Sequence, residues 1–309
     1  MFKLIHLSDP HLGPLPAIQK RQLASKRILG YINWQRNRAH SLTSKYLDGL
    51  LDDIGDMNPD HIALCGDLVN IALPAEIATA REWLKIVGSP ELVSVVPGNH
   101  DAYVPGAVKS AFTSWRPYMT SDEEQGHIIP HSKDLVFPFI RRRKELGIIG
   151  LSTARATGPF MATGYMSNLQ LRDLKTNLLK MKSEGLFRVV MLHHPPVHNS
   201  TSWHKRFVGA SRFRNVIAEC GAELILHGHT HYATKLSIAG PDGDVPVICV
   251  PSASNGPGHK KPPACYNLFE IKRKPSGWHC KMTERGYTED KLFVHTVRET
   301  TLSIPYSPQ

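Results

Sequence analysis

The sequence predicts a single α/β domain, and three observations support that prediction. Short apolar runs alternate with helical patterns over most of the 309 residues, which is typical of parallel strands connected through helices. The C-terminal part is mostly strand-like and adds antiparallel pairing. Gly and Pro are spread evenly and no internal repeat is visible, so no linker divides the chain. We expect one domain over residues 1–298, with a basic insertion at 17–40 and a loose tail at 299–309.

The individual elements follow from hydrophobic periodicity and from the residues that end each run. Residues 2–7 predict a buried strand, and 42–57 predict a helix that ends at the Asn-Pro pair 58–59. Further strands are expected at 61–65, 92–96, 187–192, 223–226, 232–238, 245–250, 266–271 and 278–282. Further helices are expected at 74–87, 169–181 and 213–218. A hairpin should join 137–140 to 147–151 through a solvated basic turn at 141–144.

The composition indicates a globular protein whose partners carry negative charge. The chain has 37 Lys and Arg against 27 Asp and Glu, a net charge of +10. Its 41% hydrophobic and 21% charged residues exclude a disordered or fibrous chain. Phosphate esters, nucleic acid and anionic lipid headgroups would all suit this charge. The 17 His outnumber the 10 Phe and the 9 Tyr, and imidazole is the commonest metal ligand in proteins.

The cysteines and the N-terminus favour a reducing compartment. The five Cys include no Cys-x-x-Cys pair, which argues against a disulfide framework or a zinc ribbon. The opening MFKLIHLSDPH lacks the basic and apolar regions of a secretory signal, and no apolar run is long enough to span a bilayer. We therefore expect a soluble, cytoplasmic protein, either free or peripheral to the inner face of the membrane.

Five short polar motifs follow predicted strands, where open α/β sheets place their ligand sites. They are Asp9-Pro10-His11, Gly66-Asp67, Gly98-Asn99-His100-Asp101, His193-His194-Pro195 and Gly228-His229-Thr230-His231. Together they supply enough carboxylate, amide and imidazole ligands for two metal ions with a shared bridge. A ligand set without thiolate favours Mn, Fe, Co or Zn over Cu(I) or an iron–sulfur cluster. Two ions about 3.5–4 Å apart suit in-line displacement at phosphorus.

In this order the five motifs resemble those of the calcineurin-like metallophosphoesterase superfamily. The resemblance spans residues 2 to about 255, and the later strands resemble the closing sheet of that family. Each motif is weak by itself, whereas all five in order, each after a strand, are specific. The resemblance implies a four-layer αββα sandwich of mixed sheets that houses a dinuclear metal centre.

The resemblance also implies a role for each residue of the motifs. The first ion would be held by Asp9, His11 and His231. Asp67 would bridge to a second ion, which would be completed by Asn99, His193 and His229. His100 would stay outside the ligand set, contact the phosphoryl oxygens and protonate or stabilise the leaving oxygen. Asp101, beside it, would orient its ring.

The expected reaction is hydrolysis of a phosphodiester by a metal-bound hydroxide that attacks in line with the leaving oxygen. The short chain and the His-His-Pro-Pro motif most resemble bacterial phosphodiesterases acting on cyclic nucleotides or glycerophosphodiesters. One alternative is hydrolysis of a lipid-linked pyrophosphate, such as a UDP-diacylglucosamine precursor. Another is a nuclease or nucleic-acid-binding protein, which ranks lowest because no basic stripe interleaved with aromatics is present.

Substrate contacts are expected from two further regions. His194 and His198, in and after the fourth motif, are candidate substrate-binding residues, each weighed against a packing role. The insertion at 17–40 has no acidic residue and six basic ones, Lys20, Arg21, Lys26, Arg27, Arg36 and Arg38. It is either a helical excursion packed on the domain with its charges in solvent, or a lid beside the metal site. Such a lid would meet an anionic, partly apolar substrate or a membrane surface.

Overall fold

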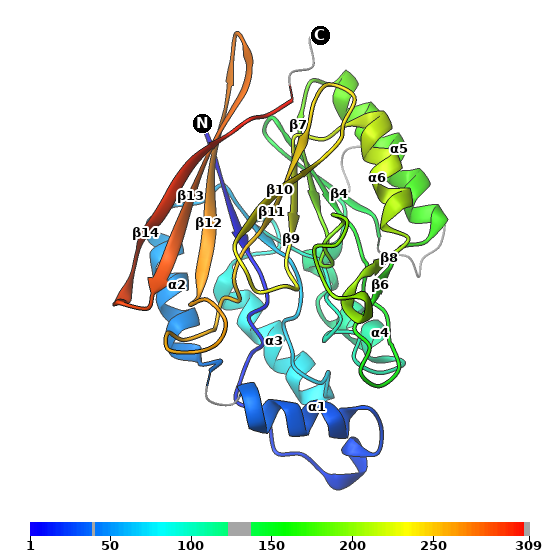
Figure 1. The fold of residues 1–309 in the computed structure, drawn as a ribbon, viewed down its shortest axis with the longest axis vertical. Helices are drawn as coiled ribbons and strands as arrows, with labels where there is room; N and C mark the ends of the chain where they lie inside the picture. Colours follow the sequence, from blue (N-terminus) through cyan, green and yellow to red (C-terminus); the bar gives the residue numbers. More distant parts are fainter. Residues whose placement is uncertain (39–40, 123–136, 306–309) are drawn as a thin grey trace.

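Two mixed sheets of six strands form the centre of the molecule (Figure 1). The computed structural model describes residues 1–38, 41–122 and 137–305 of the chain. The first sheet has the order β14 (Lys291–Leu302), β13 (Gly277–Thr288), β12 (Cys265–Lys274), β1 (Phe2–Leu7), β2 (His61–Leu64) and β3 (Val93–Val95). The second has the order β10 (Thr234–Ile238), β11 (Val245–Cys249), β9 (Leu224–His227), β7 (Phe187–Met191), β5 (Leu146–Gly150) and β4 (Phe139–Arg143).

Helices and a small third sheet complete the described part of the fold. The helices are α1 (Arg27–Asn33), α2 (Ser44–Asp56), α3 (Pro74–Val87), α4 (Ala107–Ser114), α5 (Asn168–Ser183) and α6 (Ala210–Cys220). The small sheet pairs β6 (Gly164–Tyr165) with β8 (Phe207–Val208). Among the residues that the structure describes, no helix has both the length and the apolar character needed to cross a bilayer.

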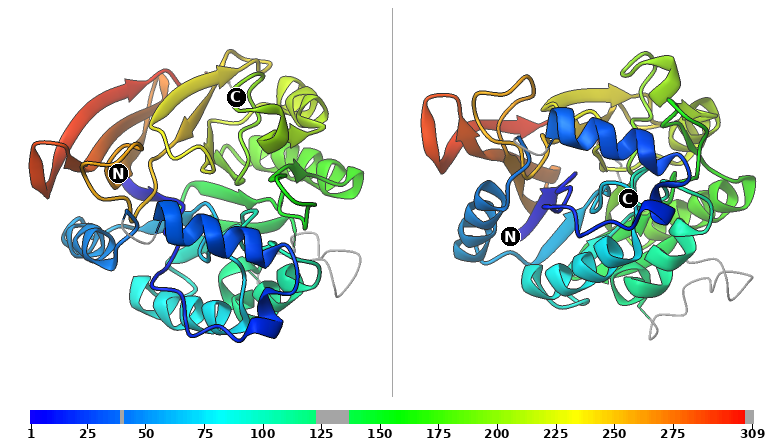
Figure 2. Two further views of the ribbon diagram at one scale, coloured as in Figure 1. Left: turned by 60° about the horizontal axis from the view of Figure 1, so that its bottom comes forward. Right: turned by 90° about the horizontal axis from the view of Figure 1, so that it is seen from below.

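The two sheets pack face to face, because alternate residues of their strands enter different hydrophobic clusters. On β7, Val189 belongs to the cluster shared with the first sheet, whereas Val190 belongs to the cluster that α5 and α6 complete. Leu224 and Ile225 of β9 divide in the same way. Helices α2 and α3 contribute their apolar faces to the cluster of the first sheet. The result is the four-layer αββα arrangement that the sequence predicts (Figures 1 and 2).

The parallel strands of both sheets end at the same end of the molecule. β1 runs parallel to β2 and β2 to β3 in the first sheet, and β5, β7 and β9 run parallel in the second. Backbone hydrogen bonds tie the loops that follow them, such as Asp9 N–H to the Gly66 carbonyl and Gly228 N–H to the His193 carbonyl. This is the lower end in Figure 1, where α1 also lies.

The start of α3 holds the loop between β2 and α3 in place. Pro74 occupies the first turn, where its missing N–H costs no helical hydrogen bond. Glu76 is buried, and its carboxylate accepts hydrogen bonds from the backbone N–H groups of Asn70 (2.7 Å) and Leu73 (2.9 Å). The carboxylate therefore caps the N-terminus of α3 at Leu73 and also satisfies an amide of the preceding loop.

The predicted hairpin is present as β4 and β5, but the prediction that its basic run is solvated is wrong for Arg141. This side chain is 2% exposed. It donates hydrogen bonds to four carbonyl oxygens, those of Pro90, Val93, Pro117 and Thr120, at 2.6–2.9 Å. Arg141 lies on the strand, not in the turn, and faces the segments that follow α3 and α4, so it satisfies backbone groups that no strand pairs.

The predicted boundary of a C-terminal tail at residue 299 is also wrong. β14 continues to Leu302, which pairs with Cys280 and is buried. The polar residues in this strand weaken its apolar alternation, which is why β14 was not predicted. Residues 306–309 of the predicted tail lie outside the described residues.

The insertion forms a surface layer with no buried residue between Lys20 and Arg38. A single 3-10 turn precedes α1, and a π-helical turn, Trp34–Arg38, continues it. Leu23 and Tyr31 pack partly against the main core, whereas Ile28 and Ile32 are exposed. Residues 39 and 40 lie outside the described residues. The insertion is therefore helical, as the first hypothesis expected, but it packs only some of its apolar residues on the domain.

We predict that Arg141→Met lowers the free energy of unfolding by about 2–4 kcal/mol, because buried carbonyl oxygens lose a charged donor. Urea denaturation followed by tryptophan fluorescence measures the change. Lys144→Met is the matched control: Lys144 is exposed and pairs with Asp60 at the surface. Its replacement should change the free energy by less than about 1 kcal/mol. Equal destabilisation by the two substitutions would contradict the role assigned to Arg141.

Candidate metal centre

The five polar motifs meet where the carboxyl ends of the two sheets come together. Six of the seven predicted ligands form two groups of three, Asp9, His11, His231 and Asp67, His193, His229. Within each group the potential ligand atoms lie within 4.8 Å of one another. Asn99, the seventh, lines the same cleft as Asp67 and His229. The first sheet supplies the loops after β1, β2 and β3, and the second sheet supplies those after β7 and β9.

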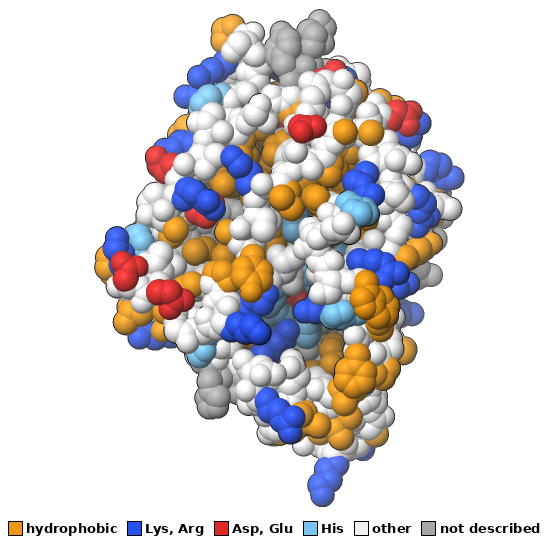
Figure 3. All heavy atoms as spheres, viewed as in Figure 1, with side chains coloured by type: hydrophobic (Ala, Val, Ile, Leu, Met, Phe, Trp, Pro, Cys, Tyr) orange, Lys and Arg blue, Asp and Glu red, His pale blue; other side chains and the backbone are white. Residues whose placement is uncertain are grey.

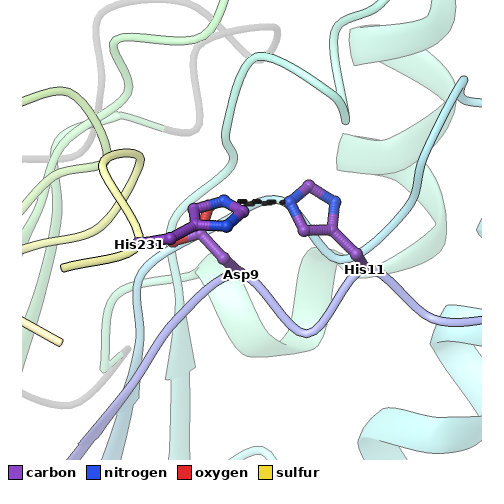
Figure 4. Close-up of side chains that lie close together, drawn as sticks. All are labelled: Asp9, His11 and His231. Carbon is purple, nitrogen blue, oxygen red and sulfur yellow. Dashed lines mark hydrogen bonds and ion pairs between the residues drawn. The ribbon is translucent and has the colours of Figure 1, made fainter. Parts of the chain in front are cut away.

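The first group is compact and mostly buried. Its two imidazoles point toward each other, with Nε2 of His11 3.3 Å from Nε2 of His231 (Figure 4). Asp9 Oδ1 lies 3.1 Å from the His231 Nε2 and 3.8 Å from the His11 Nε2. Three ligand atoms thus converge on one point, as one metal ion requires.

Asp67 lies between the two groups. Its Oδ2 is 3.9 Å from the His11 Nε2 on one side and 3.3 Å from the His193 Nε2 on the other. A single carboxylate can therefore serve both groups, which is the arrangement of a bridging ligand.

Each carboxylate has one oxygen bound to the protein and one turned to the site. Asp9 Oδ2 accepts hydrogen bonds from the Ser8 hydroxyl (2.6 Å) and the His229 N–H (2.9 Å). Asp67 Oδ1 accepts one from the His100 N–H (2.7 Å). Among the described residues, no hydrogen bond reaches three buried atoms, Asp9 Oδ1, Asn99 Oδ1 and His193 Nε2. Buried polar atoms without partners are costly, and all three are of the types that bind a divalent ion.

Backbone carbonyls fix which nitrogen of each imidazole faces the centre. The Nδ1–H of His11 donates to the Val69 carbonyl (3.2 Å) and that of His193 to the Cys65 carbonyl (2.7 Å). Their Nε2 atoms therefore face the carboxylates. His229 uses Nε2 to bind the Lys205 carbonyl (3.0 Å), which leaves Nδ1 as its ligand atom. Such outer partners orient metal-binding histidines.

Left-handed backbone conformations concentrate at the ligand residues. Asp9, His11, Asp67, His229 and His231 have φ between 41° and 73°. These five make up half of the ten non-glycine residues with positive φ in the described part of the chain. Such conformations cost of order 1–3 kcal/mol each and cluster at functional sites. Gly98 permits the close approach, because a Cβ there would collide with the Asp67 carboxylate.

The electrostatics of the buried groups favour a cation. Burial opposes a charge on His193, but the carboxylates of Asp67 and Asp9 outweigh it and raise the pKa of His193 to about 10. Burial also opposes the charge of Asp67, yet the surrounding histidines hold the pKa of this carboxyl well below its usual range. The field of the two carboxylates is therefore strong enough to hold positive charge between them.

His100 lies beside this centre, and the structure corrects the predicted origin of its orientation. Its Nδ1–H donates to the Asn70 carbonyl (2.5 Å), and its Nε2 accepts from Nη2 of Arg38 (3.1 Å). Burial and the neighbouring Arg38 lower the pKa of His100 to about 3. The ring is thus neutral, with Nε2 toward the cleft. Asn70 and Arg38 orient it, not Asp101.

Asp101 instead gathers the backbone of the loops that carry the ligands. Its carboxylate accepts hydrogen bonds from the N–H groups of Asp67 (2.9 Å), Leu68 (2.9 Å), Val69 (3.2 Å) and Gly98 (2.7 Å). Burial and the charge of Asp67 raise the pKa of Asp101 to about 7. Asp101 therefore fixes the course of the loops after β2 and β3. Its position next to His100 in the sequence did not reveal this role.

Neither His194 nor His198 is positioned to contact a substrate in the cleft. Nδ1 of His194 accepts from the Thr153 hydroxyl (2.7 Å), and its Nε2–H donates to the Ala162 carbonyl (3.1 Å). Because both nitrogens are engaged and the side chain is fully buried, His194 positions the loop before β6. His198 is exposed and is not among the residues that line the cleft.

The cleft over the centre has a cationic wall that the motifs did not predict. Its volume is about 570 Å³. Besides ligands, His100 and several uncharged residues, its lining includes Arg36, Arg38, Lys205, His259, Lys260 and Lys261. The hypothesis that the basic insertion lies beside the metal site agrees with the position of Arg36 and Arg38 in this wall. Lys205, Lys260 and Lys261 belong to no recognisable motif, so nothing in the sequence indicated them.

Similarity to known proteins extends over most of the chain. The family model described as calcineurin-like phosphoesterase matches residues 2–233. A protein of Rhodococcus erythropolis named as a probable cyclic nucleotide phosphodiesterase is 25% identical over 241 residues, which cover 77% of this chain and 67% of that protein.

Solved structures share the fold at low identity. A dimetal phosphatase from Danio rerio superposes with a TM-score of 0.57 at 13% identity, over 99% of both chains. The purple acid phosphatase PPD1 from yellow lupin superposes with a TM-score of 0.56 at 10% identity, over 98% of this chain and 53% of that one.

We predict that Asp67→Asn reduces bound metal at both sites, because an amide keeps the shape of the bridge but removes its charge. After reconstitution with Mn²⁺ and removal of free ion, metal analysis should give two ions per chain for wild type and at most one for the variant. Asp60→Asn, at a surface ion pair, is the control and should match wild type. A wild-type protein that retains no more than one tightly bound ion would refute a dinuclear centre.

A second prediction concerns Asp101. In Asp101→Asn an amide N–H₂ replaces an oxygen that accepts backbone N–H groups, so unfolding free energy should fall by about 2–3 kcal/mol. Thermal denaturation of the metal-free protein measures this loss. Asp173→Asn, a buried position on α5 away from the centre, serves as the comparison. If Asp101→Asn melts like wild type, the carboxylate does not organise the loops.

Proposed function

Because the chain belongs to the calcineurin-like phosphoesterase family and is a metal-dependent phosphoric ester hydrolase, we propose that it cleaves phosphodiesters at a pair of ion sites that share Asp67. The observation that supports this most directly is the position of Asp67 Oδ2 between His11 and His193. One carboxylate that serves two ligand groups suits a reaction in which two cations act on one phosphorus.

The proposed division of labour follows the geometry. Asp9, His11 and His231 hold one ion, and Asn99, His193 and His229 complete the other. When bound, the ions supply an activated water and neutralise charge on the phosphoryl group. The protein residues keep those ions at a fixed separation and bring the ester into line with them.

His100 and Arg38, which line the cleft beside the ligand groups, would contact the substrate. The Nε2 of His100 already accepts a hydrogen bond from the Arg38 guanidinium at the cleft. A phosphoryl oxygen entering there would receive the guanidinium N–H groups, which bind phosphate well. Nε2 of His100 would then be free to take up a proton from solvent in the cleft and to donate it to the leaving oxygen.

Diester specificity rests on two supports. The relative from Rhodococcus erythropolis is named as a probable cyclic nucleotide phosphodiesterase. The cleft of about 570 Å³ extends well beyond the ligand groups toward Arg36 and Lys260, so a second ester substituent can be accommodated. The comparisons give no support to the lipid-linked pyrophosphate hydrolase that the sequence left open.

The test is turnover of matched chromogenic esters by protein loaded separately with Mn²⁺, Fe²⁺, Zn²⁺ or Co²⁺. Bis(p-nitrophenyl) phosphate should be cleaved at least about tenfold faster, in kcat/KM, than p-nitrophenyl phosphate, if the second substituent contributes even 1.4 kcal/mol of binding. A set of 3′,5′- and 2′,3′-cyclic nucleotides then probes the proposed substrate class. Preference for the monoester with every metal would overturn the diester proposal.

We predict that His100→Ala lowers kcat about 10²–10⁴-fold on esters with poor leaving groups, while bound metal stays at the wild-type level. The loss should shrink for p-nitrophenolate, which needs little protonation. His198→Ala, outside the cleft, is the matched control and should leave kcat unchanged. A loss that is the same for good and poor leaving groups would exclude the proton-transfer role of His100.

A further inference from the structure

Five segments of the loops at the lower end of the molecule are rich in basic residues. We call these segments, which belong to the loops after β1, β5, β7, β9 and β11, the rim; they are residues 12–38 with 41–43, 152–163, 195–206, 230–233 and 251–264. Their sequences contain no Asp or Glu and eleven Lys or Arg. Without these eleven, the 37 basic residues of the chain fall to 26, against 27 acidic residues. The remainder of the protein is therefore almost neutral.

The basic residues of the rim have two orientations. Lys26 and Arg27 turn inward: Lys26 Nζ donates to the Met161 carbonyl (2.8 Å) and Arg27 to the Ile71 carbonyl (3.0 Å). The exposed cations are Lys20, Arg21, Arg36, Lys205, Arg206 and Lys260. At the margin of the rim, Glu289 accepts a hydrogen bond from the Gly258 N–H (2.6 Å). The outward field of the rim is therefore strongly positive.

Large apolar side chains project from the same loops. Phe160 is 81% exposed, Trp203 67% and Ile28 47%. Hydrogen bonds hold their segments side by side: Lys26 Nζ binds the Met161 carbonyl, and the Ala162 N–H donates to the His204 carbonyl (2.9 Å). The three side chains thus belong to one surface formed by α1 and two loops.

The backbone presents Phe160 outward at a conformational cost. Its φ is 61°, in the left-handed region that bulky residues rarely adopt. Packing contacts could compensate for this conformational strain if the side chain were buried. Phe160 makes few such contacts, because most of its surface is exposed. Strain that folding does not require is a reason to look for a function.

The space-filling view shows the same combination. Over α1 and the adjoining loops, in the lower part of Figure 3, hydrophobic and basic side chains lie together, and acidic side chains appear only higher on this face. Contiguous apolar surface at the mouth of a cleft, with basic residues around it, marks an interaction site more often than an ordinary surface.

We propose that the rim docks on an anionic lipid membrane, so that the mouth of the cleft faces the bilayer. Ile28, Phe160 and Trp203 enter the headgroup region, and Lys20, Arg21 and Arg206 contact lipid phosphates. A nucleic acid would be a weaker match, because the aliphatic Ile28 and Ile32 offer no ring on which a base can stack. The six side chains that would touch the membrane line neither the cleft nor the ligand groups, so they affect where the enzyme is located and not the ester hydrolysis itself.

The test is co-sedimentation of the purified protein with vesicles of phosphatidylcholine alone or mixed with phosphatidylglycerol, at low and high salt. Wild type should bind the mixed vesicles and lose binding as salt screens the charges. Lys20→Gln with Arg21→Gln should lower the partition coefficient roughly thirtyfold. Ile28→Ser with Phe160→Ser should lower it at least about tenfold without changing its dependence on salt.

Matched controls lie at the opposite end of the molecule. Lys272→Gln with Lys274→Gln removes two exposed charges near the turn between β12 and β13, and Ile86→Ser with Leu179→Ser removes two exposed apolar side chains from α3 and α5. Both should sediment like wild type, and all four variants should turn over a soluble diester at the wild-type rate.

Three results would overturn the proposal. The first is that wild type does not bind vesicles that contain phosphatidylglycerol. The second is that the variant with both Ile28→Ser and Phe160→Ser binds as well as wild type. The third is that the controls lose as much binding as the rim variants. In the first case, retention of a labelled oligonucleotide would assign the rim to nucleic acid instead. Because none of these readouts depends on turnover, they stand apart from the test of diester hydrolysis.

Discussion

Two buried carboxylates, each with one oxygen left open toward the other side chains of the centre, impose the constraint on which the structure depends. Asp9 is fully buried and Asp67 is 2% exposed. Isolated anions in such an environment are costly, and they persist where nearby groups offset their charge. The loops of both sheets are arranged to bind one oxygen of each carboxylate and to direct imidazoles at the other. The way the two sheets meet and the geometry of the site therefore depend on the same two carboxylates.

This arrangement of the loops strains the backbone, and side chains outside the ligand groups stabilise it. Left-handed residues such as Asp9 and Asp67 are held by hydrogen bonds that join loops of different strands, and glycines leave room where these loops cross. Asp101 and Glu76 each replace a set of missing backbone partners with a single carboxylate. Asp9 and Asp67 use one oxygen each to hold a neighbouring loop and leave the other to the centre, whereas Asp101 and Glu76 use both oxygens to hold loops.

The sequence predicted what depends on local order along the chain. Strands, helices and the five motifs follow from periodicity and from polar residues at strand ends, and parallel strands bring such ends to one edge. What it could not predict depends on which segments meet in space. Arg141 was expected in solvent because its acceptors are carbonyls of residues that lie 21 to 51 positions away. Asp101 was assigned to its neighbour His100, whereas its partners include the amides of a different loop. The side of the insertion that faces the centre was likewise invisible, since only the fold brings Arg38 to His100.

The uneven distribution of charge makes the molecule electrically asymmetric. A body that is nearly neutral, with its excess cations gathered around one opening, has a large electric dipole directed through that opening. In the field of a negatively charged partner such a dipole experiences a torque at separations of about 8 Å, the screening length at physiological salt. The protein would turn its cleft forward before any side chain makes contact. Encounters that begin in random orientations would then become productive more often than the small fraction of surface occupied by the cleft would suggest.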